Sequence, residues 1–233
     1  MSMFLSSFFQ DFMDFLFPRM CLACNEPLVH AEKYLCTHCL GMLPQTDYHL
    51  VVDNPIAKKF YGKMPVQHAT ALYQFIKKSP MQRMLHQIKY KNKPLLIRRL
   101  GIYYGMLLKD VYNCAKLDAI VPVPLHPKRL AERGYNQSFL FAQGLGTILA
   151  IPCYENVLIR QVHTTTQTGK TKYQRWENVK LAFAVSDKTT IVGKKLLLVD
   201  DLITTGSTLT ACGQTLLASG AQELYIATLA VAS

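Results

Sequence analysis

The 233-residue chain lacks the features that mark a membrane-spanning or exported protein. No apolar run is long enough to cross a bilayer. The apolar start, Met1–Phe17, has no basic residues ahead of it, no small-residue cleavage site after it, and two acidic residues, Asp11 and Asp14, within it. A secretory signal needs a basic start and a cleavable end. We therefore expect a protein of the reducing cytoplasm without a transmembrane segment.

Acidic residues are also scarce. The chain has 15 Asp and Glu against 26 Lys and Arg, a net charge of +11. Residues 77–133 hold 13 of the basic residues and three acidic ones, so this segment carries almost all of the surplus. A local basic excess attracts diphosphates, nucleic acid or an acidic partner, although a plain solvated basic face is the alternative.

Four of the seven cysteines form two C-x-x-C pairs, Cys21 with Cys24 and Cys36 with Cys39. Two such pairs supply four thiolates, the ligand set of tetrahedral structural zinc. Two disulfides, an iron–sulfur centre, or His38 in place of a neighbouring cysteine are the alternatives. So short a segment buries too little surface to fold alone, so bound metal would supply most of its stability.

An aromatic stripe precedes these cysteines. Its residues recur at helical spacing: Phe4, Phe8, Phe12 and Phe15. We expect a helix that packs on its own domain, with docking to a partner or a membrane surface as the alternative. We assign this helix and the zinc ribbon to residues 1–50 and a second domain to residues 51–233.

Alternating strand and helix patterns in the second domain predict an α/β fold, with a mostly parallel sheet covered by helices on both faces. The expected strands are 66–76, 118–123, 156–160, 195–199 and 224–230. The expected helices are 81–90, 95–108, 136–149 and 207–218. Residues 44–65 are expected to connect the two domains. The polar stretch 161–180 is too long for an ordinary connection, which is typical of a functional loop.

The strand 195–199 leads into two adjacent carboxylates and a Thr-Thr-Gly-Ser-Thr turn that opens a helix. Ligands bind at the carboxyl ends of such strands, and free N–H groups at a helix start attract anions. No Walker A pattern is present. The stretch resembles the phosphoribosyl-diphosphate motif of type I phosphoribosyltransferases. The resemblance implies that Asp200 and Asp201 are catalytic and hold the ribose hydroxyls, and that the 5′-phosphate is bound by Thr204, Thr205, Gly206, Ser207 and Thr208.

Three further blocks follow the order of the ComF family of competence-associated proteins. Val121–Gln137 (VPVPLHPKRLAERGYNQ) looks like its P-[LV]-x-x-x-R-x-x-x-R-G-[FY]-N-Q block, and Phe17-Pro-Arg-x-Cys-x-x-Cys matches its start. The third block, with Gln167-Thr-Gly, Arg175, Asn178 and Ala182-Phe183, is similar to its hood. The resemblance covers nearly the whole chain. It implies a type I phosphoribosyltransferase-like domain with an N-terminal four-cysteine zinc ribbon.

The same resemblance implies roles for further residues. The loop Val123, Pro124 and Leu125 would receive the diphosphate, with charge supplied by Lys128, Arg129 and Arg133. A flexible loop containing Gln167, Arg175 and Asn178 would close over the ligand.

Two functions are consistent with this pattern. The first is a Mg²⁺-dependent phosphoribosyltransferase with an unidentified acceptor, acting in DNA uptake during natural transformation. The second is a non-catalytic ligand sensor, or an adaptor that handles single-stranded DNA beside a helicase-type competence protein. The basic run 89–93 (KYKNK) includes an aromatic residue that could stack on a base, which favours single-stranded DNA as a partner.

Overall fold

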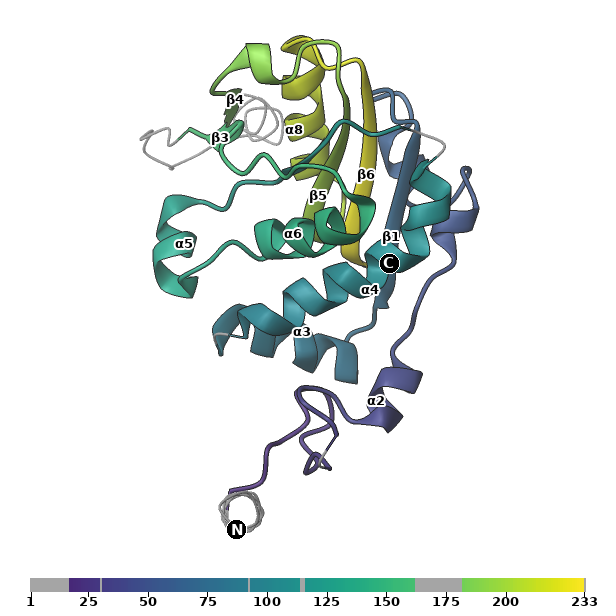
Figure 1. The fold of residues 1–233 in the computed structure, drawn as a ribbon, viewed down its shortest axis with the longest axis vertical. Helices are drawn as coiled ribbons and strands as arrows, with labels where there is room; N and C mark the ends of the chain where they lie inside the picture. The colour runs from purple at the N-terminus through teal and green to yellow at the C-terminus, as the bar shows by residue number, and fades with distance from the viewer. Residues whose placement is uncertain (1–16, 30, 92, 114–115, 162–181, 233) are drawn as a thin grey trace, which may run out of the picture.

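A computed structural model describes residues 17–29, 31–91, 93–113, 116–161 and 182–232. The four-cysteine segment lies at one end of the molecule and the α/β domain forms the remainder (Figure 1). The expected N-terminal helix lies outside the described residues. Within the described part of the chain, no helix has the length and hydrophobicity that crossing a bilayer requires.

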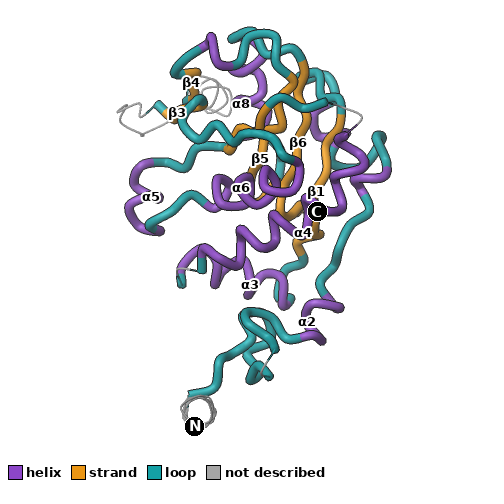
Figure 2. Tube along the Cα trace, viewed as in Figure 1, coloured by secondary structure: helices purple, strands orange, loops and turns teal. Residues whose placement is uncertain are grey.

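The α/β domain is built on a four-stranded sheet in which each pair of neighbours is parallel. Strands β1, β6 and β5 of this sheet lie side by side in Figure 2. Its order is β1 (His68–Phe75), β6 (Glu223–Ala232), β5 (Lys195–Ile203) and β2 (Ala119–Pro122). These strands are almost continuously apolar because both faces of the sheet are covered. The expected parallel sheet is confirmed.

Side-chain alternation along the strands divides the core into two layers. On β5, Leu197 and Val199 pack into the core under the long helices, whereas Leu196 and Leu198 pack into the opposite core. The first layer is formed by α3 (Pro80–Tyr90), α4 (Pro94–Asn113) and α6 (Gln137–Leu149). The second is formed by α8 (Ser207–Ala218) and η2 (Ala57–Phe60), together with the ribbon described next.

Strand 156–160 was expected in the main sheet, and this expectation is wrong. The observed strand β3 (Leu158–Arg160) pairs antiparallel with β4 (Phe183–Val185) in a separate ribbon. Only three residues pair, and just one side of β3 is buried, so it lacks the two-sided apolar pattern of the main strands.

Other elements extend or refine the expected pattern. Segment 44–65 is packed, not merely a connector, because it contains η1 (Tyr48–Leu50) and η2, and Ile56 and Phe60 are buried. A short helix, α5 (Pro127–Arg133), and the turn η3 (Lys188–Thr190) were not anticipated. Strand β5 continues four residues beyond its expected end at Val199, which brings both carboxylates into the strand.

Helices α4 and α6 cross with their backbones in direct contact. A Cβ atom on Gly101 would lie 2.3 Å from the Phe141 carbonyl oxygen, and one on Gly144 would lie 2.2 Å from the Arg98 carbonyl oxygen. Only glycine permits so close an approach. This contact fixes α6, whose first turn reaches the functional site.

The four-cysteine segment ends in helix α2 (Thr37–Met42) and joins the core of the α/β domain. Cys21, Ala23 and Cys39 belong to the same buried cluster as Leu72 of β1. Arg83 of α3 donates a hydrogen bond through Nε to the Ala23 carbonyl oxygen at 2.6 Å. The segment is therefore braced against α3 and β1.

Candidate functional site

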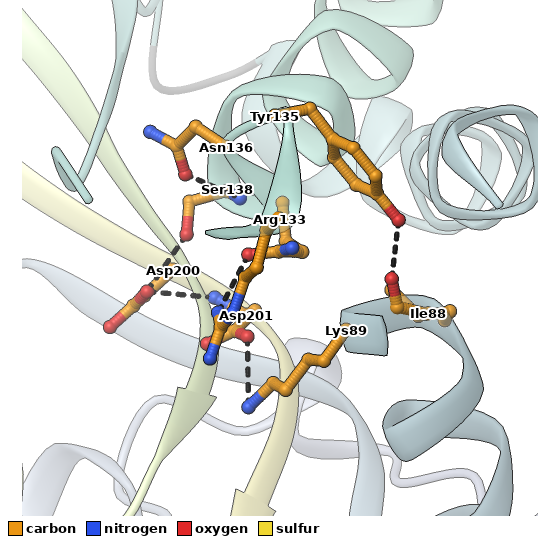
Figure 3. Close-up of polar contacts among 9 residues, drawn as sticks. Ile88, Lys89, Arg133, Tyr135, Asn136, Ser138, Asp200 and Asp201 are labelled. Carbon is orange, nitrogen blue, oxygen red and sulfur yellow. Dashed lines mark hydrogen bonds and ion pairs between the residues drawn. The ribbon is translucent and has the colours of Figure 1, made fainter. Parts of the chain in front are cut away.

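Asp200 and Asp201 lie inside β5, with Asp200 in register with Thr228 of β6. The Ser138 hydroxyl, in the first turn of α6, donates to Asp200 Oδ1 at 2.9 Å, and the Asp201 backbone N–H donates to the same oxygen at 2.9 Å (Figure 3). Burial, and after it the charge of Asp201, raises the pKa of Asp200 to about 7. Asp200 is thus a partly buried carboxyl that titrates near neutrality.

Strand alternation directs the two carboxylates toward opposite faces of the sheet. Asp201 faces α3, where Lys89 Nζ lies 3.1 Å from Asp201 Oδ2 (Figure 3). The charge of Lys89 also favours the ionised form of Asp200, whereas Arg160 of β3 is affected by the charge of Asp200 less than by that of Arg129. Burial and then the charge of Arg129 lower the pKa of Arg160. Among the described residues, the ion-pair partner of the acidic pair is therefore Lys89.

The loop that follows β5 has the form expected of an anion site. Gly206 takes a left-handed φ of +80° at the N-cap of α8, and no side chain caps this helix. The Thr205 and Ser207 hydroxyls lie 2.9 Å apart and both residues are exposed. The first backbone N–H groups of α8 have no intrahelical acceptor, so they can bind an anion.

The turn Gly134–Asn136 connects three parts of the site. Asn136 Nδ2 donates to the Val123 carbonyl oxygen at 3.0 Å, and its Oδ1 accepts from Ser138 N–H at 3.1 Å, which caps α6. The Tyr135 hydroxyl donates to the Ile88 carbonyl oxygen near the end of α3. One turn thereby holds the loop after β2, the start of α6 and the end of α3 together.

The three basic residues expected beside the loop Val123–Leu125 lie on α5. Lys128 and Arg129 are exposed there. Arg133 donates to Gln137 Oε1 at 2.9 Å, and its guanidinium carbon lies 5.8 Å from the Tyr90 ring centroid. Gln167, Arg175 and Asn178 lie outside the described residues, between β3 and β4 in the sequence.

Three residues at this site were not singled out as ligand contacts from the sequence: Ser138, Lys89 and Arg160. Ser138 directly follows the Arg-Gly-Tyr-Asn-Gln block, so its position was a usable signal. Lys89 was assigned to a DNA-binding run, whereas its ammonium lies at the acidic pair. Arg160 comes from the ribbon whose pairing was not anticipated, so the pattern gave no signal for it.

The four cysteines form a second candidate site. The sulfur atoms of Cys21, Cys24, Cys36 and Cys39 all lie within 4.8 Å of one another, and those of Cys24 and Cys36 are 3.7 Å apart. Zinc–sulfur bonds of about 2.3 Å in a tetrahedron place sulfurs about 3.8 Å apart, so the donor set fits. Burial opposes ionisation of the Cys21 thiol, but backbone N–H groups lower its pKa to about 6. The cluster can therefore hold a metal ion.

Comparisons with known proteins agree with this architecture. The phosphoribosyl transferase domain family matches residues 136–232, which contain α6, β5, α8 and β6. Competence protein F of Haemophilus influenzae is 30% identical over 210 residues, covering 88% of this chain and 82% of that protein. The DNA utilization protein YhgH of Escherichia coli is 28% identical over 229 residues, covering 90% and 95%. Competence protein ComFC of Bacillus subtilis is 26% identical over 205 residues, covering 87% and 79%.

Among solved structures, the glutamine phosphoribosylpyrophosphate amidotransferase from B. subtilis matches 61% of this chain with a TM-score of 0.44 and 19% identity. The match spans less than a third of that enzyme, 30% of its chain. Adenine phosphoribosyltransferase from Saccharomyces cerevisiae matches 61% of this chain and 72% of that one, with a TM-score of 0.41 and 21% identity.

The sequence relationship to competence protein F covers 88% of this chain. The parallel sheet, the acidic pair on β5 and the glycine loop before α8 occupy the positions expected from the family blocks. The chain belongs to the ComF family of competence and DNA-utilization proteins, built on the type I phosphoribosyltransferase fold.

Proposed function

We propose that this protein binds phosphoribosyl diphosphate with Mg²⁺ and acts as a phosphoribosyltransferase-like protein in cytoplasmic handling of incoming DNA. The observation that supports this proposal most strongly is the acidic pair directly before a glycine loop at the start of a helix. Asp200 and Asp201 would hold the two ribose hydroxyls, and Thr204–Thr208 would hold the 5′-phosphate. Bound Mg²⁺ would neutralise the diphosphate and assist its departure.

The protein's own contribution is to position and stabilise the ligand. Ser138 orients Asp200, and the Gly134–Asn136 turn holds the loop Val123–Leu125 that would face the diphosphate. Arg133 and the exposed cations of α5 would stabilise the charge that develops as diphosphate leaves. No dedicated general base is identified among the described side chains.

The test is to replace both carboxylates by alanine and measure binding of Mg²⁺–phosphoribosyl diphosphate by calorimetry. We expect Asp200→Ala with Asp201→Ala to weaken binding by at least roughly 100-fold, since two charged hydrogen-bond acceptors are lost. Asp110→Ala is the matched control, because Asp110 is exposed on α4. Unchanged affinity in a folded double variant would refute the site. Failure of the wild type to bind would refute the proposed function.

Single-stranded DNA binding is a second candidate function, favoured by an exposed aromatic residue beside cations. Tyr90 is 65% exposed at the end of α3, next to the exposed Lys91, and Arg98 and Arg99 are exposed on α4. Basic surfaces with aromatic platforms bind single strands without sequence preference. Such a surface would suit an adaptor beside a helicase-type partner.

This candidate predicts salt-sensitive binding of an oligonucleotide. Counterion release lowers affinity by about 0.7 log units per phosphate contact for each tenfold rise in salt. Fluorescence anisotropy at two salt concentrations should show this dependence, and replacing Lys91 and Lys93 by Glu should weaken binding at least tenfold. If the affinity for the oligonucleotide changes neither with salt nor with both substitutions, the basic face serves a protein partner or is simply solvated.

A further inference from the structure

The Lys89 ammonium lies in the site beside the Asp201 carboxylate. Its side chain is 20% exposed and that of Asp201 is 17% exposed, so this ion pair is largely removed from solvent. An ammonium group has three N–H donors, and Asp201 Oδ2 engages one of them. An acceptor-rich ligand next to Asp201 would find the remaining donors available.

The surrounding contacts determine which end of the ligand Lys89 would meet. The Gly134–Asn136 turn binds the Ile88 carbonyl oxygen on α3 and the Val123 carbonyl oxygen after β2. Lys89 is therefore tied to the side of the site where the loop Val123–Leu125 lies. The opposite end, at Gly206, packs instead against Phe60 and Lys59 of η2.

A second buried donor lies on the same side. Gln137 is 1% exposed, and its Oε1 accepts from Arg133. Its Nε2 makes no hydrogen bond of normal geometry among the described residues, although it lies close enough to the Tyr135 hydroxyl to oppose the rise in the pKa of that group. A buried N–H group without an acceptor is costly, so an anionic ligand beside it would relieve this cost. Lys89, Arg133 and Gln137 thus offer donors from three helices, α3, α5 and α6.

We propose that Lys89 is a ligand-contacting residue that bridges Asp201 and the diphosphate of the bound ligand. Helix α3 then supplies part of the diphosphate site, in addition to the loop after β2. This inference rests on the proposed function, and it makes the diphosphate, not the sugar phosphate, the part of the ligand that Lys89 recognises. The Asp201 carboxylate keeps acceptor positions for a ribose hydroxyl while it holds Lys89.

The test compares Lys89→Met with Lys109→Met, which removes the same charge from an exposed position on α4. Calorimetry with Mg²⁺ measures the affinity of each variant for phosphoribosyl diphosphate, inorganic diphosphate and ribose 5-phosphate. We expect Lys89→Met to weaken both diphosphate ligands roughly tenfold or more and to change ribose 5-phosphate by less than about threefold. Lys109→Met should leave all three within about threefold, and Lys89→Arg should retain diphosphate binding.

The other outcomes separate this inference from the proposed function. Unchanged or tighter diphosphate binding in folded Lys89→Met would overturn the inference, as would equal weakening of all three ligands, which indicates an effect through Asp201 alone. If the wild type binds inorganic diphosphate but not phosphoribosyl diphosphate, the proposed function fails. In that case, loss of inorganic diphosphate binding in Lys89→Met still supports Lys89 as the residue that contacts diphosphate. If the wild type binds neither, both are overturned. Thermal unfolding shows whether each variant is folded. If Lys89→Met does not fold, the diphosphate affinity of Lys89→Arg tests the inference instead.

Discussion

Asp200 is held in an environment that opposes its ionisation. The Ser138 hydroxyl and the Asp201 N–H group stabilise its charge, but burial and the adjacent carboxylate outweigh them. In an unfolded chain an aspartate has a pKa of about 3.9. The folded protein therefore binds a proton at Asp200 more tightly than the unfolded chain does, and folding stability must depend on pH through this group.

The sign of this dependence can be tested with Asp200→Asn. The contribution of Asp200 is most favourable below about pH 4 and is lost as pH rises toward 7, because the unfolded chain ionises in this range while the folded state still holds its proton. The variant should be more stable than the wild type at pH 8, by roughly 2–4 °C in Tm if about 1 kcal/mol is gained.

Thermal unfolding of both proteins from pH 5 to pH 8 measures this effect. The difference in Tm should grow with pH, whereas Asp110→Asn, at an exposed position on α4, should show a constant difference. A difference for Asp200→Asn that is flat, or that shrinks as pH rises, would contradict the assigned environment of this carboxyl.

Individual residues of the site were partly predictable. The acidic pair and the Thr204–Thr208 turn follow one another in sequence, so one local pattern identifies them. Lys89 reaches the pair from α3, and its placement depends on how distant segments pack. Strand alternation predicts that adjacent aspartates face opposite sides of the sheet, but it does not predict which cation lies near either of them.

At the scale of elements, the crossing of α4 and α6 is the tightest contact that supports the site. The atoms that a Cβ on Gly101 or Gly144 would strike are backbone atoms of the facing helix. Backbone cannot rotate aside as a flexible side chain does, so added volume must separate the helices. Because α6 carries Ser138 in its first turn, such a shift would reach Asp200.

We therefore expect Gly101→Ala and Gly144→Ala each to destabilise the protein by about 1–3 kcal/mol or more. Urea denaturation provides the measurement. Gly41→Ala in α2 is the control, because a Cβ there would have no heavy atom within 4 Å, and it should be neutral or slightly stabilising. If Gly101→Ala costs no more than Gly41→Ala, the close crossing is wrong.

The elements of the main sheet were predictable because their patterns are strong. Buried parallel strands are continuous apolar runs, and all four were found near their expected positions. The ribbon of β3 and β4 was not predictable, since three-residue strands carry little pattern. The end of β5 was placed too early because polar aspartates interrupt the apolar run while β6 still pairs with it.

At the scale of the whole molecule, the four-cysteine segment and the α/β domain share a core. Cys21 and Cys39 pack in the cluster that contains Leu72 of β1, and Arg83 bonds to the backbone between the cysteines. We propose that zinc is the bound metal, at about one ion per chain. Its loss would release this segment from α3 and β1.

Cys36→Ala should remove the metal and make residues 17–45 sensitive to limited proteolysis. The sheet and helices within 51–161 and 182–232 should stay resistant, because they supply most of both buried clusters. Elemental analysis and mass spectrometry of the fragments are the measurements. Cys153→Ala, outside the cluster, should keep both the metal and the resistance. Iron with visible absorbance in the wild type, or no metal at all, would contradict the zinc assignment.

The strand order has a consequence for synthesis on the ribosome. β6 lies between β1 and β5, and about 150 residues separate β1 from β6 in the sequence. At about 5–20 residues per second, β1 must wait roughly 8–30 s for its only described sheet neighbour to be made. During that interval the apolar strand β1 and the helices that cover it in the folded protein have no completed sheet to pack on. The nascent chain therefore exposes apolar surface that chaperones can bind before the ligand site forms.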